Sequence, residues 1–138
     1  MELKKFNYLE DRNLVALKKI CKNSGSRALN GTFEYLRVLF YFNKDKVVSE
    51  FIPDVAYYVA QVGKDKIRLV DLGVSLEQQR KGIGSLLIKR VVDLAKSKGL
   101  KKITLRTSSE ETAFMFYQKL GFKDVALNKN DIEMELKI

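Results

Sequence analysis

The stretch Asp71–Ser97, with the sequence DLGVSLEQQRKGIGSLLIKRVVDLAKS, predicts the end of a strand, a basic loop and a long amphipathic helix. Backbone N–H groups at the start of a helix are unpaired and the helix dipole is positive there, so such a loop suits phosphate. Gly82 and Gly84 lack a Cβ, which lets the main chain come close to a ligand. Lys81, with Arg80 beside it, would add positive charge.

Two common phosphate-binding patterns are absent from this stretch. No G-x-x-x-x-G-K-[ST] sequence occurs in the chain, which excludes a Walker A loop. The dinucleotide fingerprint G-x-G-x-x-G would need glycine at position 87, where the chain has Leu87. Taken alone, a glycine pair before a helix is more often an ordinary turn than a ligand loop.

The composition is that of a globular domain. The chain has 138 residues, of which 46% are hydrophobic and 31% charged, enough for one domain with a core. No apolar run approaches the ~20 residues that span a bilayer, so we expect no membrane association. The N-terminus also lacks the apolar core of a signal peptide. We therefore expect a single domain over residues 1–138, located in the cytoplasm.

The residue types present limit the possible chemistry. The chain has one cysteine, Cys21, and no histidine, which excludes an internal disulfide, a cysteine or histidine zinc site and Ser-His-Asp catalysis. A net charge of +9 favours an anionic ligand such as coenzyme A, nucleic acid or an acidic protein surface. Because the lysines are scattered along the sequence, a solvated basic surface explains them better than a dedicated nucleic-acid face.

Strand and helix signals alternate on both sides of the opening stretch. Strands are predicted at residues 3–8, 35–42, 47–52, 55–62, 67–74, 101–106, 122–127 and 132–137, and helices at 13–22, from the loop to Gly99, and at 110–120. Residues 29–42 also fit a helix, and this alternative stays open. Pro53 predicts a bulge or an edge position. A right-handed parallel crossover is expected between strands 67–74 and 101–106.

Two local signatures resemble those of one protein family. Residues 79–84, QRKGIG, are similar to the acyl-CoA loop of the GNAT N-acetyltransferase superfamily, Q/R-x-x-G-x-G/A. Residues 110–122, EETAFMFYQKLGF, are similar to the family pattern N-x-x-A-x-x-[FL]-Y-x-x-x-G-F, with Glu110 in place of the asparagine. The resemblance implies an α/β (α+β) fold: a mixed central sheet of about seven strands, flanked by helices, with a splay between strands 67–74 and 101–106.

The same resemblance implies an acetyl-CoA-dependent N-acetyltransferase, in which a primary amine attacks the thioester directly in a ternary complex. The residues that it assigns to acetyl-CoA are Leu72, Gly73, Val74, Gln79, Arg80, Lys81, Gly82, Ile83, Gly84, Ser85, Glu110 and Tyr117. A backbone N–H near Leu72 would face the thioester oxygen. Tyr117 would act as the catalytic acid toward the departing thiolate, since a phenol with a pKa of ~10 is protonated at neutral pH. Without the resemblance, Tyr117 fits equally a helix aromatic residue that packs on the sheet.

The base that would deprotonate the amine is less well defined. Without histidine it would be a carboxylate or an ordered water chain. Asp71 is the candidate catalytic carboxylate, and Glu50 and Glu110 are alternatives. Asp71 interrupts an apolar strand face, so it either serves as a base or pairs with Arg68, Arg106 or solvent.

Several functional questions stay open at the level of sequence. The acceptor amine could belong to a protein or to a small molecule, and the resemblance allows a homodimer without an evident interface stripe. Glu110 at the asparagine position and the unassigned base leave an alternative: a non-catalytic, acyl-CoA-binding regulatory module of GNAT-like shape. A nucleic-acid-binding role is disfavoured because the chain has no recognition-helix motif.

Overall fold

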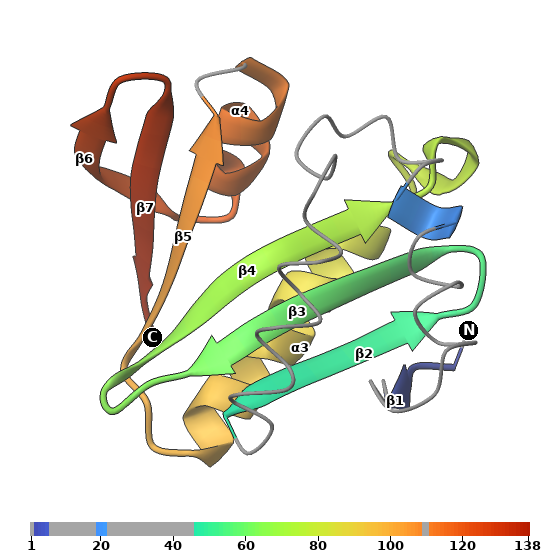
Figure 1. Ribbon diagram of the computed structural model, residues 1–138, viewed down its shortest axis with the longest axis horizontal. Coiled ribbons are helices and arrows are strands. Elements are labelled where there is room, and N and C mark those ends of the chain that lie inside the picture. The colour runs from blue at the N-terminus through green and yellow to red at the C-terminus, as the bar shows by residue number, and fades with distance from the viewer. Residues whose placement is uncertain (1, 6–18, 22–45, 109–110) are drawn as a thin grey trace.

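The computed structural model describes residues 2–5, 19–21, 46–108 and 111–138. These residues form a seven-stranded mixed sheet in the order β1-β2-β3-β4-β5-β7-β6 (Figure 1). The elements are β1 (Lys4–Lys5), β2 (Val47–Ile52), β3 (Ala56–Val62), β4 (Lys66–Val74), the 3₁₀ helix η2 (Leu76–Gln78), α3 (Ile83–Ser97), β5 (Lys102–Ser108), α4 (Glu111–Lys119), β6 (Lys123–Asn128) and β7 (Asp131–Lys137). The predicted fold class is confirmed.

Strands β4 and β5 are parallel neighbours only where they begin. Their pairing extends from Lys66 opposite Lys102 to Leu69 opposite Leu105, although both strands continue for several residues. Beyond Leu69 the two strands diverge, and β5, β7 and α4 lean away from β2, β3 and β4 (Figure 1). The predicted splay is confirmed. Within the described residues, the second half of β4 therefore has a strand partner only on its β3 side.

A β-bulge in β4 lies at the point where the splay begins. Val59 pairs with Asp71 and Ala60 pairs with Leu69, so Val70 is an extra residue. An extra residue reverses the alternation of side chains across the sheet. Leu69 and, after the bulge, Leu72 pack in the core beneath α3. Asp71 consequently faces the opposite side of the sheet.

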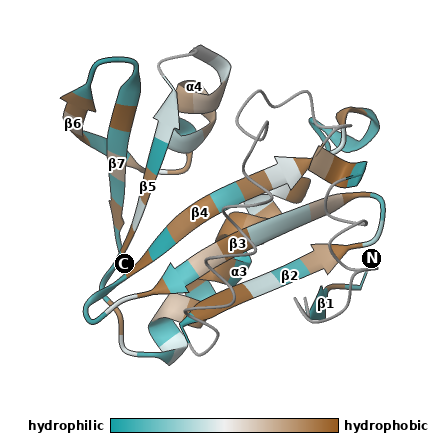
Figure 2. Ribbon diagram, viewed as in Figure 1, coloured by the Kyte–Doolittle hydropathy of each residue, from teal (hydrophilic) through white to brown (hydrophobic). Residues whose placement is uncertain are grey.

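Helix α3 supplies the main hydrophobic contact to the sheet. Its buried stripe is made of Ile83, Leu87, Ile88, Val91 and Ala95. The helix crosses behind β3 and β4 in the view of Figure 1, and the central strands are rich in hydrophobic residues (Figure 2). Gly99, with φ of +70°, follows the helix end as predicted. The 3.6-residue period correctly places Ile83, Leu87, Val91 and Ala95 on the core face, but it also includes Leu86, which is exposed, and omits Ile88, which is buried.

The predicted elements agree with the structure except in detail. The expectation that Pro53 forces a bulge or an edge position is wrong, since Pro53 lies in the turn between β2 and β3. There the Val55 N–H donates to the Ile52 oxygen at 2.9 Å, and the missing N–H of proline costs nothing. The predictions for residues 6–18 and 22–45, including the choice between strand and helix at 29–42, lie outside the described residues. No helix in the described part of the chain is both long and apolar enough to cross a membrane.

Candidate active site

The loop between β4 and α3 leaves the start of the helix open. Gly82, the residue that precedes the helix, has φ of 79°, and no side chain caps the helix there. A Cβ at Gly82 would meet nothing within 4 Å among the described residues, so no described side chain or backbone crowds this position before the helix. The Leu86 N–H makes the first helical bond, to the Gly82 oxygen at 3.0 Å. The preceding N–H groups, those of Ile83, Gly84 and Ser85, therefore suit an anion such as a pyrophosphate.

The loop is braced against the end of β4. The Gln79 Nε2 donates to the Val74 oxygen at 2.9 Å, and the Lys81 Nζ donates to the Gln78 Oε1 at 3.4 Å. Arg80 adopts φ of 63°, a left-handed conformation that is uncommon outside glycine. Arg80 and Lys81 are exposed on the same loop. The structure thus brings the predicted loop residues together, with Gln79 as a brace within the loop.

Hydrogen bonding to β3 shows which N–H groups of β4 face the splay. The Ser75 N–H donates to the Val55 oxygen at 2.8 Å, on the β3 side. Backbone groups of successive residues in a strand point to opposite edges, so Gly73 also faces β3, whereas Leu72 and Val74 face the splay. The brace from Gln79 to the Val74 oxygen agrees with this assignment. Two of the predicted edge residues, Leu72 and Val74, are therefore placed to pair with an extended ligand.

Gly73 is explained by a neighbouring side chain. A Cβ at Gly73 would lie 2.4 Å from the Cε1 of Tyr57, which is its cross-strand partner on β3. A glycine within a strand marks either a close approach by a ligand or a bulge. Instead the Tyr57 ring occupies the space, and the bulge is at Val70. Gly73 thus permits Tyr57 to lie flat over β4.

Tyr57 and the main chain hold the carboxylate of Asp71. The Tyr57 hydroxyl donates to Oδ2 of Asp71 at 2.7 Å, and the Leu72 N–H donates to Oδ1 at 2.9 Å. Burial raises the pKa of Asp71, and these two hydrogen bonds lower it less than burial raises it. Burial and the adjacent Asp71 carboxylate both raise the pKa of Tyr57, which stays protonated. Asp71 is therefore a stronger proton acceptor than an ordinary aspartate.

The expected alternative partners of Asp71 are wrong. Arg68 donates from Nη1 to Glu133 Oε1 at 3.0 Å, and Arg106 donates from Nε to Glu133 Oε2 at 3.3 Å. Glu133 lies on β7, a strand far away in the sequence. Both arginines are therefore engaged by another carboxylate, and the hydrogen-bond partners of Asp71 among the described residues, Tyr57 and the Leu72 N–H, are uncharged.

Glu50, the other described candidate base, forms an ion pair with Arg90 on the face of the sheet that is opposite to Asp71. The Arg90 Nε donates to Glu50 Oε1 at 2.7 Å, and the Tyr58 hydroxyl donates to the same oxygen. Burial raises the pKa of Glu50, but these hydrogen bonds and the charge of Arg90 bring it below its ordinary value. Tyr58 belongs to the core under α3, so Glu50 faces α3. This carboxylate is unsuited to accept a proton at the splay.

Tyr117 stands on α4, across the splay from β4. Its ring makes edge-to-face contacts with Phe116, with centroids 5.0 Å apart, and with Phe122, at 5.6 Å. Burial raises the pKa of the Tyr117 hydroxyl, and the negative charge of Asp71 raises it further. The hydroxyl therefore stays protonated at neutral pH, and it lies within electrostatic range of the Asp71 carboxylate. This is the state that a proton donor requires.

The matching family model decides the family of this chain. The model, described as an acetyltransferase (GNAT) domain, matches residues 15–134. The chain belongs to the GNAT acetyltransferase family. The family predicted from the two signatures is confirmed.

Curated relatives match this GNAT chain over part of their length. The [ribosomal protein bS18]-alanine N-acetyltransferase of Salmonella typhimurium is 28% identical over 76 residues, which are 54% of this chain and 51% of that protein. N-acetyltransferase family 8 member 3 of Mus musculus is 33% identical over 61 residues, which are 44% of this chain and 27% of that protein. The chain thus spans about half the length, or less, of the curated relatives it matches.

Solved GNAT structures share the fold over nearly the whole chain. The paiA N-acetyltransferase of Thermoplasma acidophilum in complex with coenzyme A has a TM-score of 0.74 at 19% identity, covering 100% of both chains. The ribosomal-protein-S18-alanine N-acetyltransferase of Escherichia coli has a TM-score of 0.76 at 20% identity, covering 99% of this chain and 93% of that one. At these identities the likeness shows the fold.

Two features of the GNAT site escaped the sequence analysis. Tyr57 was not singled out, and the one sequence signal for it is an aromatic residue on the strand that pairs with Gly73. Phe116 comes within 3.0 Å of the position of a Cβ at Gly84, so α4 packs against the first turn of α3. Glu110 lies outside the described residues.

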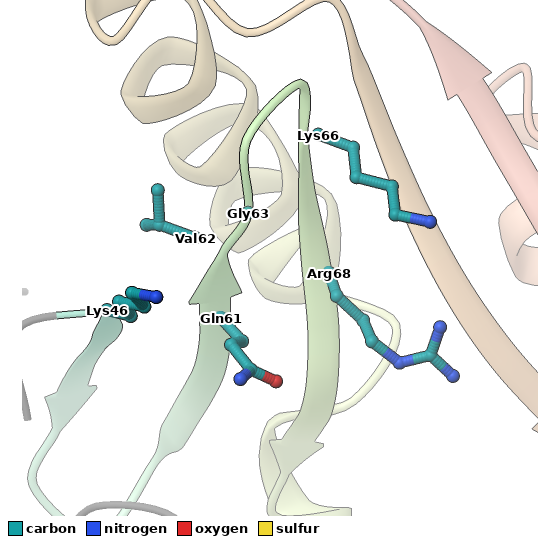
Figure 3. A pocket seen from close by; sticks show the side chains of 6 residues that line it. All are labelled: Lys46, Gln61, Val62, Gly63, Lys66 and Arg68. Carbon is teal, nitrogen blue, oxygen red and sulfur yellow. The ribbon is translucent and has the colours of Figure 1, made fainter. Parts of the chain in front are cut away.

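A hollow elsewhere on the GNAT domain is remote from this site. It has a volume of about 240 Å³ and lies at the hairpin end of β3 and β4, the end opposite to the loop (Figure 3). Its lining consists of Lys46, Gln61, Val62, Gly63, Lys66 and Arg68. The hollow contains none of the predicted site residues.

Proposed function

We propose that this chain is an acetyl-CoA-dependent N-acetyltransferase that moves an acetyl group to a primary amine by direct attack in a ternary complex. The observation that carries the proposal is the open N-terminus of α3 beside the unpaired edge of β4. The family match over residues 15–134 supports one catalytic domain spanning residues 1–138. Coenzyme A in solved structures of the same fold supports the choice of acetyl-CoA.

The chain would hold acetyl-CoA with two sets of backbone groups. The N–H groups of residues 80–85 would bind the pyrophosphate at the positive end of α3, with the charges of Arg80 and Lys81 nearby. Leu72 and Val74 would pair with the amides of the pantetheine arm, as an added strand does. Glu110 stands at the position of the family asparagine and would lie beside the cofactor.

The side chains of the site would move protons during the transfer. Bound acetyl-CoA supplies the acetyl group as an activated thioester. A bond forms between the amine nitrogen and the acetyl carbon while the bond from that carbon to sulfur breaks. Asp71 would accept a proton from the amine, and Tyr117 would give its proton to the departing sulfur and regain one from solvent. Starting from an ammonium acceptor, the reaction releases one proton overall.

The acceptor would be a primary amine of a protein or of a small molecule. By their names, the bS18 relatives act on an alanine of a ribosomal protein, and a structural neighbour acts on aminoglycosides. The net charge of +9 favours an acceptor with an acidic surface. A ribosomal substrate in the named relatives supports a cytoplasmic location for this chain.

A thiol-release assay tests the proposal. The purified chain is incubated with acetyl-CoA and a panel of amines: a peptide with N-terminal alanine, an N-terminally blocked peptide with one lysine, and an aminoglycoside. We expect thiol release that depends on one class of amine, with the acetylated product seen by mass spectrometry. Calorimetric binding of acetyl-CoA without release on any amine would favour the non-catalytic module that Glu110 suggests.

A further inference from the structure

The Leu72 N–H on the splay edge of β4 already has a partner within the site. It points into the splay, and it donates to Oδ1 of Asp71 at 2.9 Å. The other carboxylate oxygen, Oδ2, accepts the Tyr57 hydroxyl at 2.7 Å. A side chain that binds the N–H of the next residue therefore covers the edge where an extended ligand would pair.

The thioester of acetyl-CoA would need this same N–H, and this step rests on the proposed function. Along the described edge after the bulge, Leu72 and Val74 offer N–H groups to the splay. Leu72 adjoins Asp71, whose charge reaches the hydroxyl of Tyr117, whereas Val74 lies nearer the loop. A carbonyl at Leu72 would therefore bring the acetyl group nearer to both candidate catalytic side chains than a carbonyl at Val74 would.

We propose that the Leu72 N–H is an exchangeable donor. In the free chain Asp71 holds it, and on acetyl-CoA binding it passes to the carbonyl oxygen of the thioester, which leaves Asp71 a stronger proton acceptor. The Leu72 N–H thereby polarises the thioester carbonyl. Because Asp71 loses this hydrogen bond, its carboxylate becomes more basic at the same time. The carboxylate gains basicity only when the cofactor is in place.

Tyr57 is the positioning residue in this exchange. Tyr57 is fully buried, and its ring lies against Gly73. Its hydroxyl therefore stays hydrogen-bonded to Asp71 when the Leu72 N–H leaves the carboxylate. The remaining hydrogen bond keeps the carboxylate facing the splay. Without Tyr57, Asp71 would lose its orientation and one of the two donors that stabilise its charge.

Among the described residues, the groups that face Asp71 leave it as the titrating group of the cluster. They are Tyr57 from β3, Cys21 from the helical residues 19–21, and Tyr117 from α4. Burial raises the pKa of each of these three hydroxyl or thiol groups, so all three stay neutral at and below neutral pH. No cation of the described residues pairs with Asp71. If Asp71 loses a hydrogen-bond donor when the ligand binds, its pKa rises, and the protein takes up protons from solution.

The experiment compares two ligands that differ in the carbonyl oxygen. Calorimetric binding of acetyl-CoA and of S-ethyl coenzyme A is measured in buffers of different ionisation enthalpy, which gives the protons taken up. We expect acetyl-CoA to take up more protons, up to about one per ligand. Because binding raises the pKa of Asp71, the affinity ratio of acetyl-CoA to S-ethyl coenzyme A should rise as pH falls, by up to about tenfold per pH unit.

Variants assign the proton to Asp71. Asp71→Asn should abolish the difference between the two ligands, whereas Asp65→Asn, at an exposed position in the turn between β3 and β4, should preserve it. Tyr57→Phe should move the pH dependence to higher pH, since it removes a donor that lowers the pKa of free Asp71.

The comparison of the two ligands uses the wild-type protein, so its outcome does not depend on whether a variant folds. Equal proton uptake with both ligands at every pH would overturn the exchange, and amine-dependent thiol release would still uphold the transferase. Failure of both ligands to bind would overturn the exchange and the proposed function together.

Discussion

At the scale of single residues, Tyr117 is the side chain whose change should separate chemistry from binding. Tyr117→Phe keeps the ring contacts with Phe116 and Phe122 and removes only the hydroxyl. We expect kcat to fall by about 10²–10⁴-fold, the range for a lost proton donor, with KM for acetyl-CoA little changed. Steady-state kinetics with the preferred amine measures both constants.

A matched variant controls for the loss of a buried tyrosine hydroxyl. Tyr58→Phe removes the hydroxyl that donates to Glu50 on the α3 side of the sheet, away from the splay. Its kcat should stay near that of the wild type. Unchanged turnover in Tyr117→Phe would remove Tyr117 from the mechanism.

Asp71 should also change how the free energy of unfolding depends on pH. Burial raises its pKa in the folded chain, so the folded state binds its proton more tightly than the unfolded state. The stabilising contribution of this proton is present at low pH and is lost as pH rises through the folded pKa. As pH rises above the ordinary pKa of an aspartate, about 4, the free energy of unfolding of the wild type should fall relative to that of Asp71→Asn.

Denaturant titrations of both proteins at several pH values measure this difference. The trend with pH isolates the titration from any constant effect of the asparagine. A difference between the two proteins that is the same at every pH would show that Asp71 has an unperturbed pKa.

Sequence patterns can propose site residues whose role would be local, but they do not find contacts that depend on strand register. Gly82, Lys81 and Tyr117 belong to short motifs and could be found by pattern. Tyr57 could not, because its contact with Asp71 requires the pairing of β3 with β4 and the extra residue at Val70. The arginines expected to pair with Asp71 bind Glu133 instead, since β7 lies beside β5 in the sheet.

At the scale of elements, the two ends of α3 offer a matched test of the anion site. Gly82 precedes the helix with φ of +79° and Gly99 follows it with φ of +70°, and a Cβ at either glycine meets nothing within 4 Å. Gly82→Asp should abolish binding of acetyl-CoA, because it puts a side chain and a negative charge where the phosphates would lie. Gly99→Asp should bind normally in the same calorimetric titration.

Stability should change in the opposite order, which removes unfolding as an explanation. A carboxylate is favourable near the positive N-terminus of a helix and unfavourable near its C-terminus, each by about 0.3–1 kcal/mol. Gly99→Asp should therefore be the less stable variant and still bind. Normal binding by Gly82→Asp would exclude the loop as the pyrophosphate site.

The elements themselves were largely predictable because their signals are periodic. The apolar stripe of α3 and the alternation in β7 are properties of short windows, and both elements lie close to where they were expected. The splay was expected from the family resemblance alone. The bulge at Val70 was not, because one extra residue in an apolar strand changes no local pattern. Pro53 was assigned to a strand defect because a proline in a turn and one in a bulge give the same signal.

At the scale of the whole molecule, the sheet consists of two parts with little pairing between them. One part carries β1–β4 and the other β5, β7 and β6, and β4 meets β5 only from Lys66 to Leu69. Helix α3 spans the junction, since its core includes Leu69 of β4 together with Ile103 and Leu105 of β5. A ligand that pairs with the free edge of β4 would add contacts at the weakest line of the fold.

Acetyl-CoA should therefore stabilise the chain and protect one edge of the sheet. At about 100 times its Kd, a ligand that binds only the folded state raises the free energy of unfolding by about 2.7 kcal/mol. Thermal unfolding should show this increase in stability. Hydrogen exchange should slow most at Val74, whose N–H faces the splay and whose oxygen already accepts a hydrogen bond from Gln79.

The competing anion site is the basic hollow lined by Lys46, Lys66 and Arg68 at the far end of β3 and β4. Protection confined to that hollow would place the ligand there and contradict the site at α3, because the two sites lie at opposite ends of the same strands.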